Sequence, residues 1–376
     1  MKNLRELHLQ GNQLTGTIRA SLFELPHLKY LDMSDNLLQG HIPISPSSNL
    51  SPSLQTLILS RNKLEGTFDL FWLRNLTVLE TVELSMNADL TVGVTFSGWV
   101  PHFRLRSLML SDCNIDNSII PFLGTQHHLQ VLDLSSNKLT GNILIWIFTN
   151  EATLLYLDLS NNLLVGSVDP MWWHQSNLSF INISMNHFEG QLPNNISSVF
   201  PNLEALDASY NNISGYIPLS LCNISGIQLV DLSNNKFIGE VHACLFTDLD
   251  VPILKLSDNN LGGPILGGAN NLSVLEISLG GNRFEGTLPS NLSAINMYIM
   301  DLHDNNLSGN LTASYWNLPF LAVLNIASNN LTGEIDPTIC KLTGHVFLDL
   351  SDNKLMGSIP NCNGNLPLQV LSVRSE

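Results

Sequence analysis

Aspartate and serine recur two residues apart along the chain, and these are the side chains whose spacing could do chemistry. The aspartates are Asp32, Asp133, Asp158, Asp207, Asp231, Asp301 and Asp349, and serine follows most of them two residues on. A column of carboxylates favours a basic partner on electrostatic grounds. Calcium would also need the enclosing loop that such sites use, which the pattern lacks. The alternative is that Asp and Ser are repeat consensus that solubilises each strand.

No catalytic constellation is present in the sequence. The eleven histidines are scattered, and no nucleophile-elbow, zinc-protease or phosphate-loop spacing appears. We expect neither enzyme activity nor a cofactor or metal. The formal net charge of −16 also disfavours nucleic acid, which requires a basic footprint.

The element that must position these residues is a short repeat, clearest in residues 129–143, LQVLDLSSNKLTGNI. Leu132 and Leu134 alternate with polar residues, which is the period of a strand with one buried face. Asn137 falls where the strand ends, and a buried amide there can bond the unpaired backbone groups of the turn. One such unit cannot bury its own leucines, so it must stack on copies of itself.

The repeat asparagine, or its substitute, occurs fifteen times at steps of 23 to 26 residues. The positions are Asn12, Asn36, Asn62, Asn87, Cys113, Asn137, Asn162, Asn186, Asn211, Asn235, Asn259, Asn282, Asn305, Asn329 and Asn353. No linker or charge block interrupts them. We predict a single domain over residues 1–376, with about fifteen full repeats, a truncated sixteenth and no cap at either end.

The consensus LxxLxLxxNxLxGxIPxxLxxL resembles the plant-specific class of leucine-rich repeats. The resemblance implies an α/β solenoid, a superhelix with a parallel β-sheet on its concave face and loops or short 3-10 or α-helical turns on its convex face. Residues 105–147, with Cys113-Asn114 at the repeat asparagine and Trp146 near the end, resemble the central repeats of plant receptor-like proteins. Those are cell-surface receptors with one membrane helix and no kinase.

The second resemblance implies the extracellular ligand-recognition region of such a receptor, acting in defence or development through partner receptor kinases. A peptide, protein or glycan would bind the concave face, and the parent protein would be a glycoprotein at the outer face of the plasma membrane. This chain shows neither a signal-peptide run nor an apolar stretch of ~18 to 20 residues. A soluble inhibitor of a wall-degrading enzyme, similar to polygalacturonase-inhibiting proteins, and an intracellular scaffold remain alternatives.

Four cysteines occupy equivalent points of neighbouring repeats, and Cys113 stands apart. Cys222 and Cys244 form one pair, and Cys340 and Cys362 the other. Stacked coils lie ~4.8 Å apart, within reach of a disulfide. We expect two bridges and one free structural cysteine, with small buried thiols as the alternative.

Twelve glycosylation sequons favour a secretory route. They are Asn49, Asn75, Asn177, Asn182, Asn195, Asn212, Asn223, Asn271, Asn291, Asn306, Asn310 and Asn330. Some arise from the repeat itself, which weakens the signal. A glycan on Asn182 would stand on the expected binding face.

Departures from the consensus on the concave face are the candidate ligand contacts. Exposed aromatic residues, Met and Arg are enriched at binding hot spots. The candidates are Phe180, Met185, Tyr210, Arg61, Lys255 and His303, with Asp158, Asp207 and Asp231 of the acidic column. Phe180, Met185 and Tyr210 come from consecutive turns, and we expect them to form one patch. Solitary surface apolar residues are the alternative.

Overall fold

The computed structural model describes residues 3–45, 47–96, 98–142, 153–169, 176–247, 251–269, 271–294, 296–341, 347–362 and 368–373. The chain divides into two compact units, Met1–His187 and Phe188–Glu376. Each unit is described by itself below, and the expectation of a single domain stays a prediction. Trp146 lies outside the described residues.

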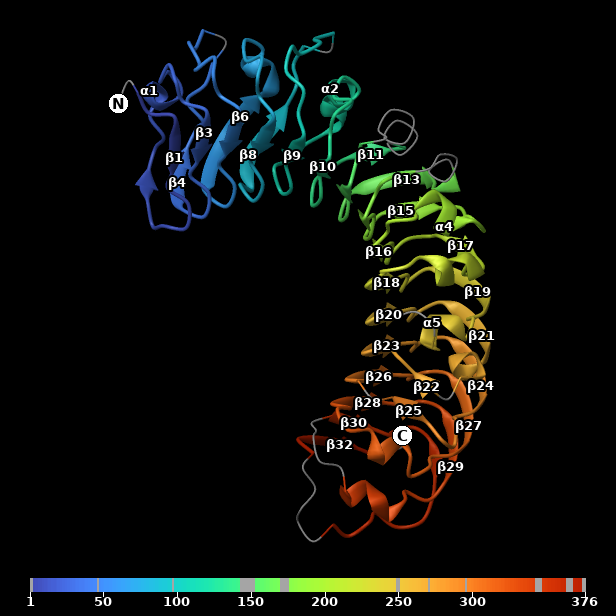
Figure 1. Cartoon of the computed structure of the whole chain (residues 1–376). Coiled ribbons are helices and arrows are strands. Elements are labelled where there is room, and N and C mark those ends of the chain that lie inside the picture. Colours follow the sequence, from blue (N-terminus) through green and yellow to red (C-terminus); the bar gives the residue numbers. More distant parts are fainter. Residues whose placement is uncertain are drawn as a thin grey trace. The chain divides into compact units, whose positions relative to one another are not determined.

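Each unit is organised around a ladder of parallel three-residue strands (Figure 1). The first unit has β1 (Glu6–His8), β3 (Tyr30–Asp32), β5 (Thr56–Ile58), β7 (Thr81–Glu83), β9 (Ser107–Met109), β10 (Val131–Asp133), β12 (Tyr156–Asp158) and β14 (Phe180–Asn182). The second has β16 (Ala205–Asp207), β18 (Leu229–Asp231), β20 (Ile253–Lys255), β23 (Glu276–Ser278), β26 (Ile299–Asp301), β28 (Val323–Asn325), β30 (Phe347–Asp349) and β32 (Val370–Ser372).

The alternation of the sequence sets the two faces of these strands. The middle residue of a strand points into the core, as Leu132 does at 1% exposure, and it pairs in register with Leu157 of the next strand. The first and third residues point outward. We call the surface that they form the sheet face.

A second set of short strands and single helical turns lies opposite the sheet face, as Figure 1 shows clearly for the second unit. The first unit has β2 (Thr15–Gly16), β4 (Leu37–Gly40), β6 (Lys63–Asp69), β8 (Asp89–Gly93), β11 (Thr140–Gly141), β13 (Leu163–Ser167), α1 (Ala20–Phe23), η1 (Leu70–Leu73), η2 (Asn117–Ile119) and α2 (Ile120–Leu123). The second has β17 (Ser214–Gly215), β19 (Lys236–Glu240), β21 (Asn260–Pro264), β22 (Asn271–Leu272), β24 (Arg283–Thr287), β25 (Ser293–Ala294), β27 (Asn306–Asn310), β29 (Asn330–Gly333), β31 (Lys354–Leu355), α4 (Ile196–Val199), η4 (Leu219–Asn223), α5 (Cys244–Thr247), η5 (Ile265–Gly268), η6 (Tyr315–Asn317) and η7 (Pro337–Lys341). β15 (His187–Glu189) spans the boundary. The predicted solenoid is confirmed.

The repeat asparagines form a ladder that joins each coil to the one before it. Asn259 is 8% exposed, and its Nδ2 donates to the carbonyls of Leu256 and Ser257 at 3.1 Å and of Leu232 in the preceding coil at 3.0 Å. Its Oδ1 accepts from the backbone N–H of Phe237 at 3.0 Å. One amide thus satisfies four backbone groups of two turns that would otherwise be buried without partners.

Cys113 replaces a ladder asparagine but reproduces only the hydrogen bonds that the asparagine amide donates. Its Sγ donates to the Leu84 carbonyl at 3.1 Å and to the Ser111 carbonyl at 3.4 Å, but a thiol offers no strong acceptor. The amide of Leu90 instead donates to the Asn87 carbonyl at 2.9 Å, within its own coil. Burial raises the pKa of the Cys113 thiol to about 12, so this free cysteine is unreactive at neutral pH.

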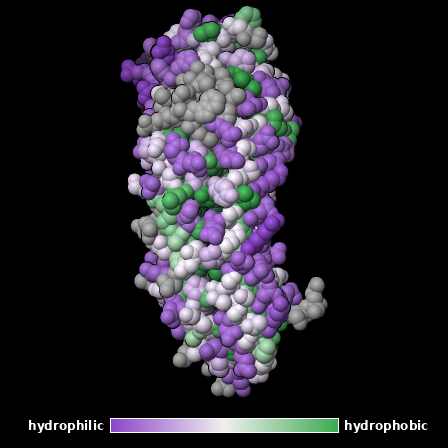
Figure 2. Space-filling view, turned by 90° about the vertical axis from the view of Figure 1, so that its right-hand side faces the viewer, coloured by the Kyte–Doolittle hydropathy of each residue, from purple (hydrophilic) through white to green (hydrophobic). Residues whose placement is uncertain are grey.

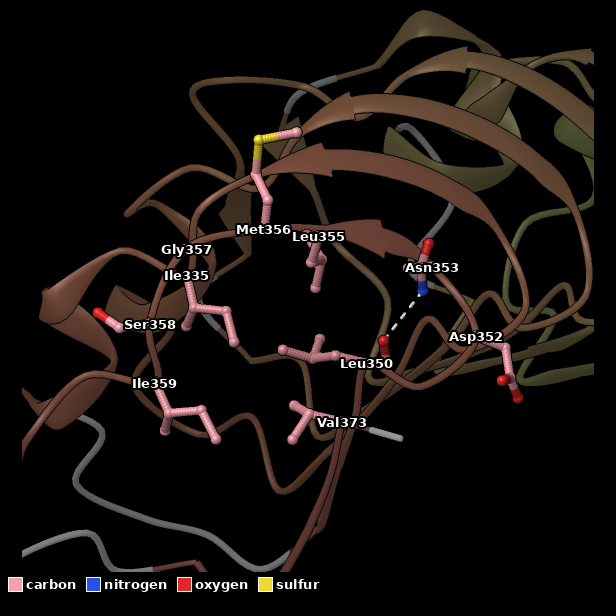
Figure 3. A pocket seen from close by; sticks show the side chains of 10 residues that line it. All are labelled: Ile335, Leu350, Asp352, Asn353, Leu355, Met356, Gly357, Ser358, Ile359 and Val373. Carbon is pink, nitrogen blue, oxygen red and sulfur yellow. Dashed lines mark hydrogen bonds between the residues drawn. The ribbon is translucent and has the colours of Figure 1, made fainter. Parts of the chain in front are cut away.

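The last coils leave core-type side chains around a pocket of about 190 Å³ (Figure 3). Ile335, Leu350, Leu355, Ile359 and Val373 lie around it, and the drawn hydrogen bond joins Asn353 to the Leu350 carbonyl at 3.2 Å. These aliphatic side chains occupy the positions that stack on a neighbouring coil elsewhere in the unit. The pocket therefore belongs to the stacking surface of the solenoid.

Two disulfides link neighbouring coils of the second unit. Cys222 of η4 is bonded to Cys244 of α5, with the two Cα atoms 5.9 Å apart. Cys340 of η7 is bonded to Cys362, with a Cα separation of 5.2 Å. Each bridge closes a loop of one repeat on the side opposite the sheet face.

We predict that Asn259→Ala lowers the free energy of unfolding by about 3 kcal/mol, because three carbonyls and one N–H lose their buried partner. Urea unfolding followed by circular dichroism measures the loss. Asn195→Ala is the control, since Asn195 is exposed at the start of α4 and its side chain makes no capping bond. Equal effects of the two substitutions would show that the ladder does not hold the coils.

Peptide mapping without reduction should recover the pairs Cys222–Cys244 and Cys340–Cys362 and a free Cys113 when the chain is made in an oxidising compartment. Replacing Cys222 and Cys244 together by serine should cost about 3 kcal/mol of stability, the entropy of closing a loop of this length. Alkylation of all four paired cysteines in the folded secreted protein would contradict both statements.

Candidate functional site

The aspartates of the sheet face are engaged in the turn that follows each strand. In β18, Asp231 Oδ1 accepts from the backbone N–H of Ser233 at 3.0 Å and from its hydroxyl at 2.5 Å. The same pair of bonds joins Asp158 to Ser160 and Asp207 to Ser209. This geometry supports the alternative stated above, in which Asp and Ser are structural consensus. Their carboxylates are still the main acidic groups of the sheet face.

Asp158 is a candidate carboxylate whose pKa is shifted by its surroundings. It is only 9% exposed, and burial raises its pKa, with the hydrogen bonds from Ser160 acting in the opposite direction. Asn182 holds the equivalent place in β14 and makes the same two bonds to Ser184, at 3.0 and 2.7 Å. A neutral amide therefore serves the turn as a carboxylate does.

Phe180, Met185 and Tyr210 occupy different kinds of position. Phe180 begins β14, and its ring stacks on Tyr156 with centroids 4.3 Å apart. Met185 and Tyr210 each precede a ladder asparagine in a turn, at φ of 53° and 52°, and are 53% and 55% exposed. Tyr210 belongs to the second unit, whereas the other two belong to the first. The single patch expected from the sequence stays a prediction.

The three basic candidates each contact a carboxylate. Arg61 lies in a turn at φ of 55°, with Nε 3.8 Å from Asp35 Oδ1, and both side chains are more than half exposed. Lys255 Nζ lies 3.1 Å from Glu276 Oε1 across the β20–β23 pair. His303 Nδ1 lies 2.7 Å from Asp301 Oδ1, and His303 occupies the position that serine holds in most repeats. Lys255 is thus part of the sheet face, whereas His303 and Arg61 lie at its margin, after the strands end.

Sequence reasoning missed a pocket of about 540 Å³ at the start of the strands in the second unit. It is lined by Ile253, Leu275, Glu276, Asn296, Tyr298 and Phe320. These residues come from neighbouring coils whose spacing differs, so no motif marks them. Only Ile253 and Glu276 of the lining begin strands, so the strand pattern gave little signal for the pocket.

Ten of the twelve sequon asparagines are exposed. Asn182 is half-buried within the turn bonds given above, and Asn330 is half-buried and donates to Asn306 Oδ1 at 2.7 Å. A glycan would be attached to Asn182 Nδ2, which is half-buried and lies 3.4 Å from Asp158 Oδ2, so we expect carriers among the exposed sites. Away from the sheet face of the second unit, hydrophilic side chains alternate with short apolar patches (Figure 2).

No group of three or more His, Cys, Asp or Glu side chains that could hold a metal was found among the described residues. None of the helices in that part of the chain has the length and apolar character needed to cross a membrane.

Comparisons with known proteins agree with this geometry. Sequence models of the leucine-rich repeat match residues 2–64, 125–145, 202–224, 320–342 and 346–366. The chain is a leucine-rich-repeat protein. It is 36% identical over 318 residues to Receptor-like protein 15 of Arabidopsis thaliana, which covers 76% of the chain and 32% of that relative. Its curated relatives are thus plant receptor-like proteins.

Solved structures support the same family of folds. The crystal structure of a TDR receptor matches with a TM-score of 0.79 and 25% identity, over 99% of this chain and 68% of that one. The leucine-rich-repeat ectodomain of the Arabidopsis receptor kinase HAESA, solved with an extended IDA peptide hormone, matches with a TM-score of 0.63 and 26% identity, over 99% of this chain and 73% of that one. Matches to the receptor-like proteins span only 18% to 43% of their length.

We predict that Asp158→Asn leaves this leucine-rich-repeat protein at least as stable as the wild type at pH 7, whereas Asp158→Ala costs about 1–3 kcal/mol. The amide keeps both turn bonds, as Asn182 shows. Because the folded-state pKa of Asp158 is raised, stability from this group is present at acid pH and falls as pH rises through that pKa.

Urea unfolding of the two variants and the wild type, between about pH 3 and pH 7, measures the difference. The Asn variant should lack this fall with pH. An Asn variant that is less stable than the wild type at neutral pH would show that the carboxylate charge is required. Asp304→Asn, at an exposed turn residue, is the control.

Proposed function

We propose that this chain is the extracellular ligand-recognition region of a plant receptor-like protein, and that the sheet face binds a peptide. In the parent protein this region would act in defence or developmental signalling through partner receptor kinases. The binding role belongs to the side chains described above, and the coupling to kinases rests on the resemblance to receptor-like proteins.

One observation carries the proposal. The residues that hold the coils together, the leucines and ladder asparagines, are nearly constant from coil to coil, whereas the first and third strand residues change. Backbone and side-chain bonds of the scaffold point inward, so the sheet face can vary without loss of the fold. A surface of that kind suits recognition of one ligand among many.

The comparisons support the peptide class. The HAESA ectodomain was solved with a peptide hormone, and it shares the fold over nearly the whole of this chain. A peptide can lie across several coils and contact the outward residues of successive strands. The acidic column would raise the rate at which a basic peptide approaches.

Secretion fits the covalent chemistry of the second unit. Two disulfides are stable only in an oxidising compartment, and the exposed sequons are acceptors for glycans there. The extracellular face of the plasma membrane, with the parent protein as anchor, meets both conditions.

Fractionated extracellular fluid from plant tissue tests the peptide proposal against its alternatives. The full chain, produced through the secretory route and immobilised, should retain material that protease treatment destroys and glycosidase treatment leaves intact. The Asn259→Ala variant is the control for binding by a disrupted fold. Retention that survives protease would favour a glycan, and inhibition of a polygalacturonase by the chain would favour the inhibitor; either result contradicts the peptide proposal.

A further inference from the structure

Four consecutive strands of the second unit abandon the Asp-x-Ser pattern of the sheet face. β16, β18 and β30 keep it, with hydrogen bonds from Asp to Ser in each. In each of the four strands between β18 and β30, another residue holds the Asp position, the Ser position or both. The residues are Lys255 and Ser257 in and after β20, Ser278 and Gly280 for β23, Asp301 and His303 for β26, and Asn325 and Ala327 for β28. Other strands also lack the pattern, namely β32 and, in the first unit, β1, β5, β7, β9 and β14, but β20, β23, β26 and β28 are four in succession and lie next to one another in the ladder.

The substitutions in this group are complementary to each other. A Cβ atom added to Gly280 would lie 2.3 Å from the His303 ring, so the imidazole fills the space that a serine side chain takes in other repeats. His303 in turn bonds Asp301. Gly280 and His303 therefore form one arrangement across two coils, which independent drift of consensus positions does not explain.

The pocket missed by the sequence opens in these same coils, at the start of their strands. Two aromatic side chains at its rim are largely exposed, Tyr298 at 57% and Phe320 at 58%, and Leu275 is 41% exposed. Exposed aromatic residues gathered around a hollow are costly to leave in water and are enriched at binding hot spots. An apolar side chain of a ligand would cover them.

The charges around the pocket select the ligand. Glu276 is the carboxylate of the lining, and Lys255 already bonds it. The whole chain carries a formal net charge of −16. An acidic ligand would be repelled, whereas a lysine or arginine can compete with Lys255 for Glu276.

We propose that β20, β23, β26 and β28 form the specificity site, and that it takes an extended basic peptide. An aromatic or large aliphatic side chain enters the pocket between Tyr298 and Phe320, and a neighbouring Lys or Arg bonds Glu276. The proposal rests on the proposed peptide function and narrows it. It assigns Lys255 and His303 to the site and leaves Phe180 and Met185 outside it.

A library of short random peptides, passed over the full disulfide-bonded chain, tests the assignment. Retained peptides should combine an aromatic or large aliphatic residue with a nearby Lys or Arg. For one such peptide, the double substitution Tyr298→Ser with Phe320→Ser should raise Kd by about 30-fold or more, because a binding hot spot is lost. Glu276→Gln should weaken only peptides that contain the basic residue.

Matched controls separate the site from the fold. Tyr216→Ser removes a tyrosine that is 67% exposed after β17, away from the sheet face, and should leave Kd unchanged. Phe180→Ala should do the same in the first unit. If the double serine variant does not fold, the Glu276→Gln comparison still decides the question.

Three outcomes would overturn the proposal. Retained peptides that are acidic or lack an apolar residue contradict the ligand class. Peptides whose binding ignores Tyr298, Phe320 and Glu276 overturn the site but leave the peptide function standing. Retention of no peptide at all contradicts both, and a neutral glycan or a second copy of the chain would then be the occupant.

Discussion

The ladder asparagine is the interaction on which the rest of the structure depends. Each coil must end its strand, turn inward and begin again, and the backbone groups of that turn are out of reach of water. An amide has two donors and one acceptor oxygen, which suits a turn with surplus carbonyls and an unpaired N–H in the preceding coil. The leucines supply the apolar area for stacking, but the asparagine fixes the register at which coils stack.

This constraint explains why the sheet face can carry function. The scaffold bonds of Asn259 go to backbone atoms, so the identity of outward residues does not matter to them. The Asp and Ser of the consensus add local turn bonds, yet β23 and β28 form without that pair. Where the pair is given up, residues such as Lys255 and His303 become available for recognition. Receptors of one fold can thus differ in their ligands.

The sequence predicted the fold well because its signals are local and repeated. Leu132, Leu134 and Asn137 each mark one position of the coil. Because the pattern occurs fifteen times, the assignment of residues to positions in the coil is unambiguous. The cysteine pairs of the structure also follow from equivalent positions, since stacked coils bring such positions together.

The site was harder to predict for physical reasons. Met185 and Tyr210 were expected on the concave face, and the structure places them in left-handed turns after the strands, because the residue before the ladder asparagine must reverse the chain. For the acidic column the sequence left open a surface for a basic partner and a structural consensus, and the Oδ1 atoms are bonded to serine. The pocket depends on side chains such as Leu275 and Phe320 from different coils, and a linear pattern does not record that proximity.

Hydrogen exchange at single amides of the wild-type chain tests the ladder most directly. Amides that donate to ladder oxygens, such as Leu64 to Asn87 and Phe237 to Asn259, should exchange only with opening of their unit. The amide of Leu90, which faces the coil of Cys113 and has no ladder oxygen, should exchange faster than both. Exchange at Leu90 as slow as at Leu64, or fast exchange at the ladder-bonded amides, would contradict the account.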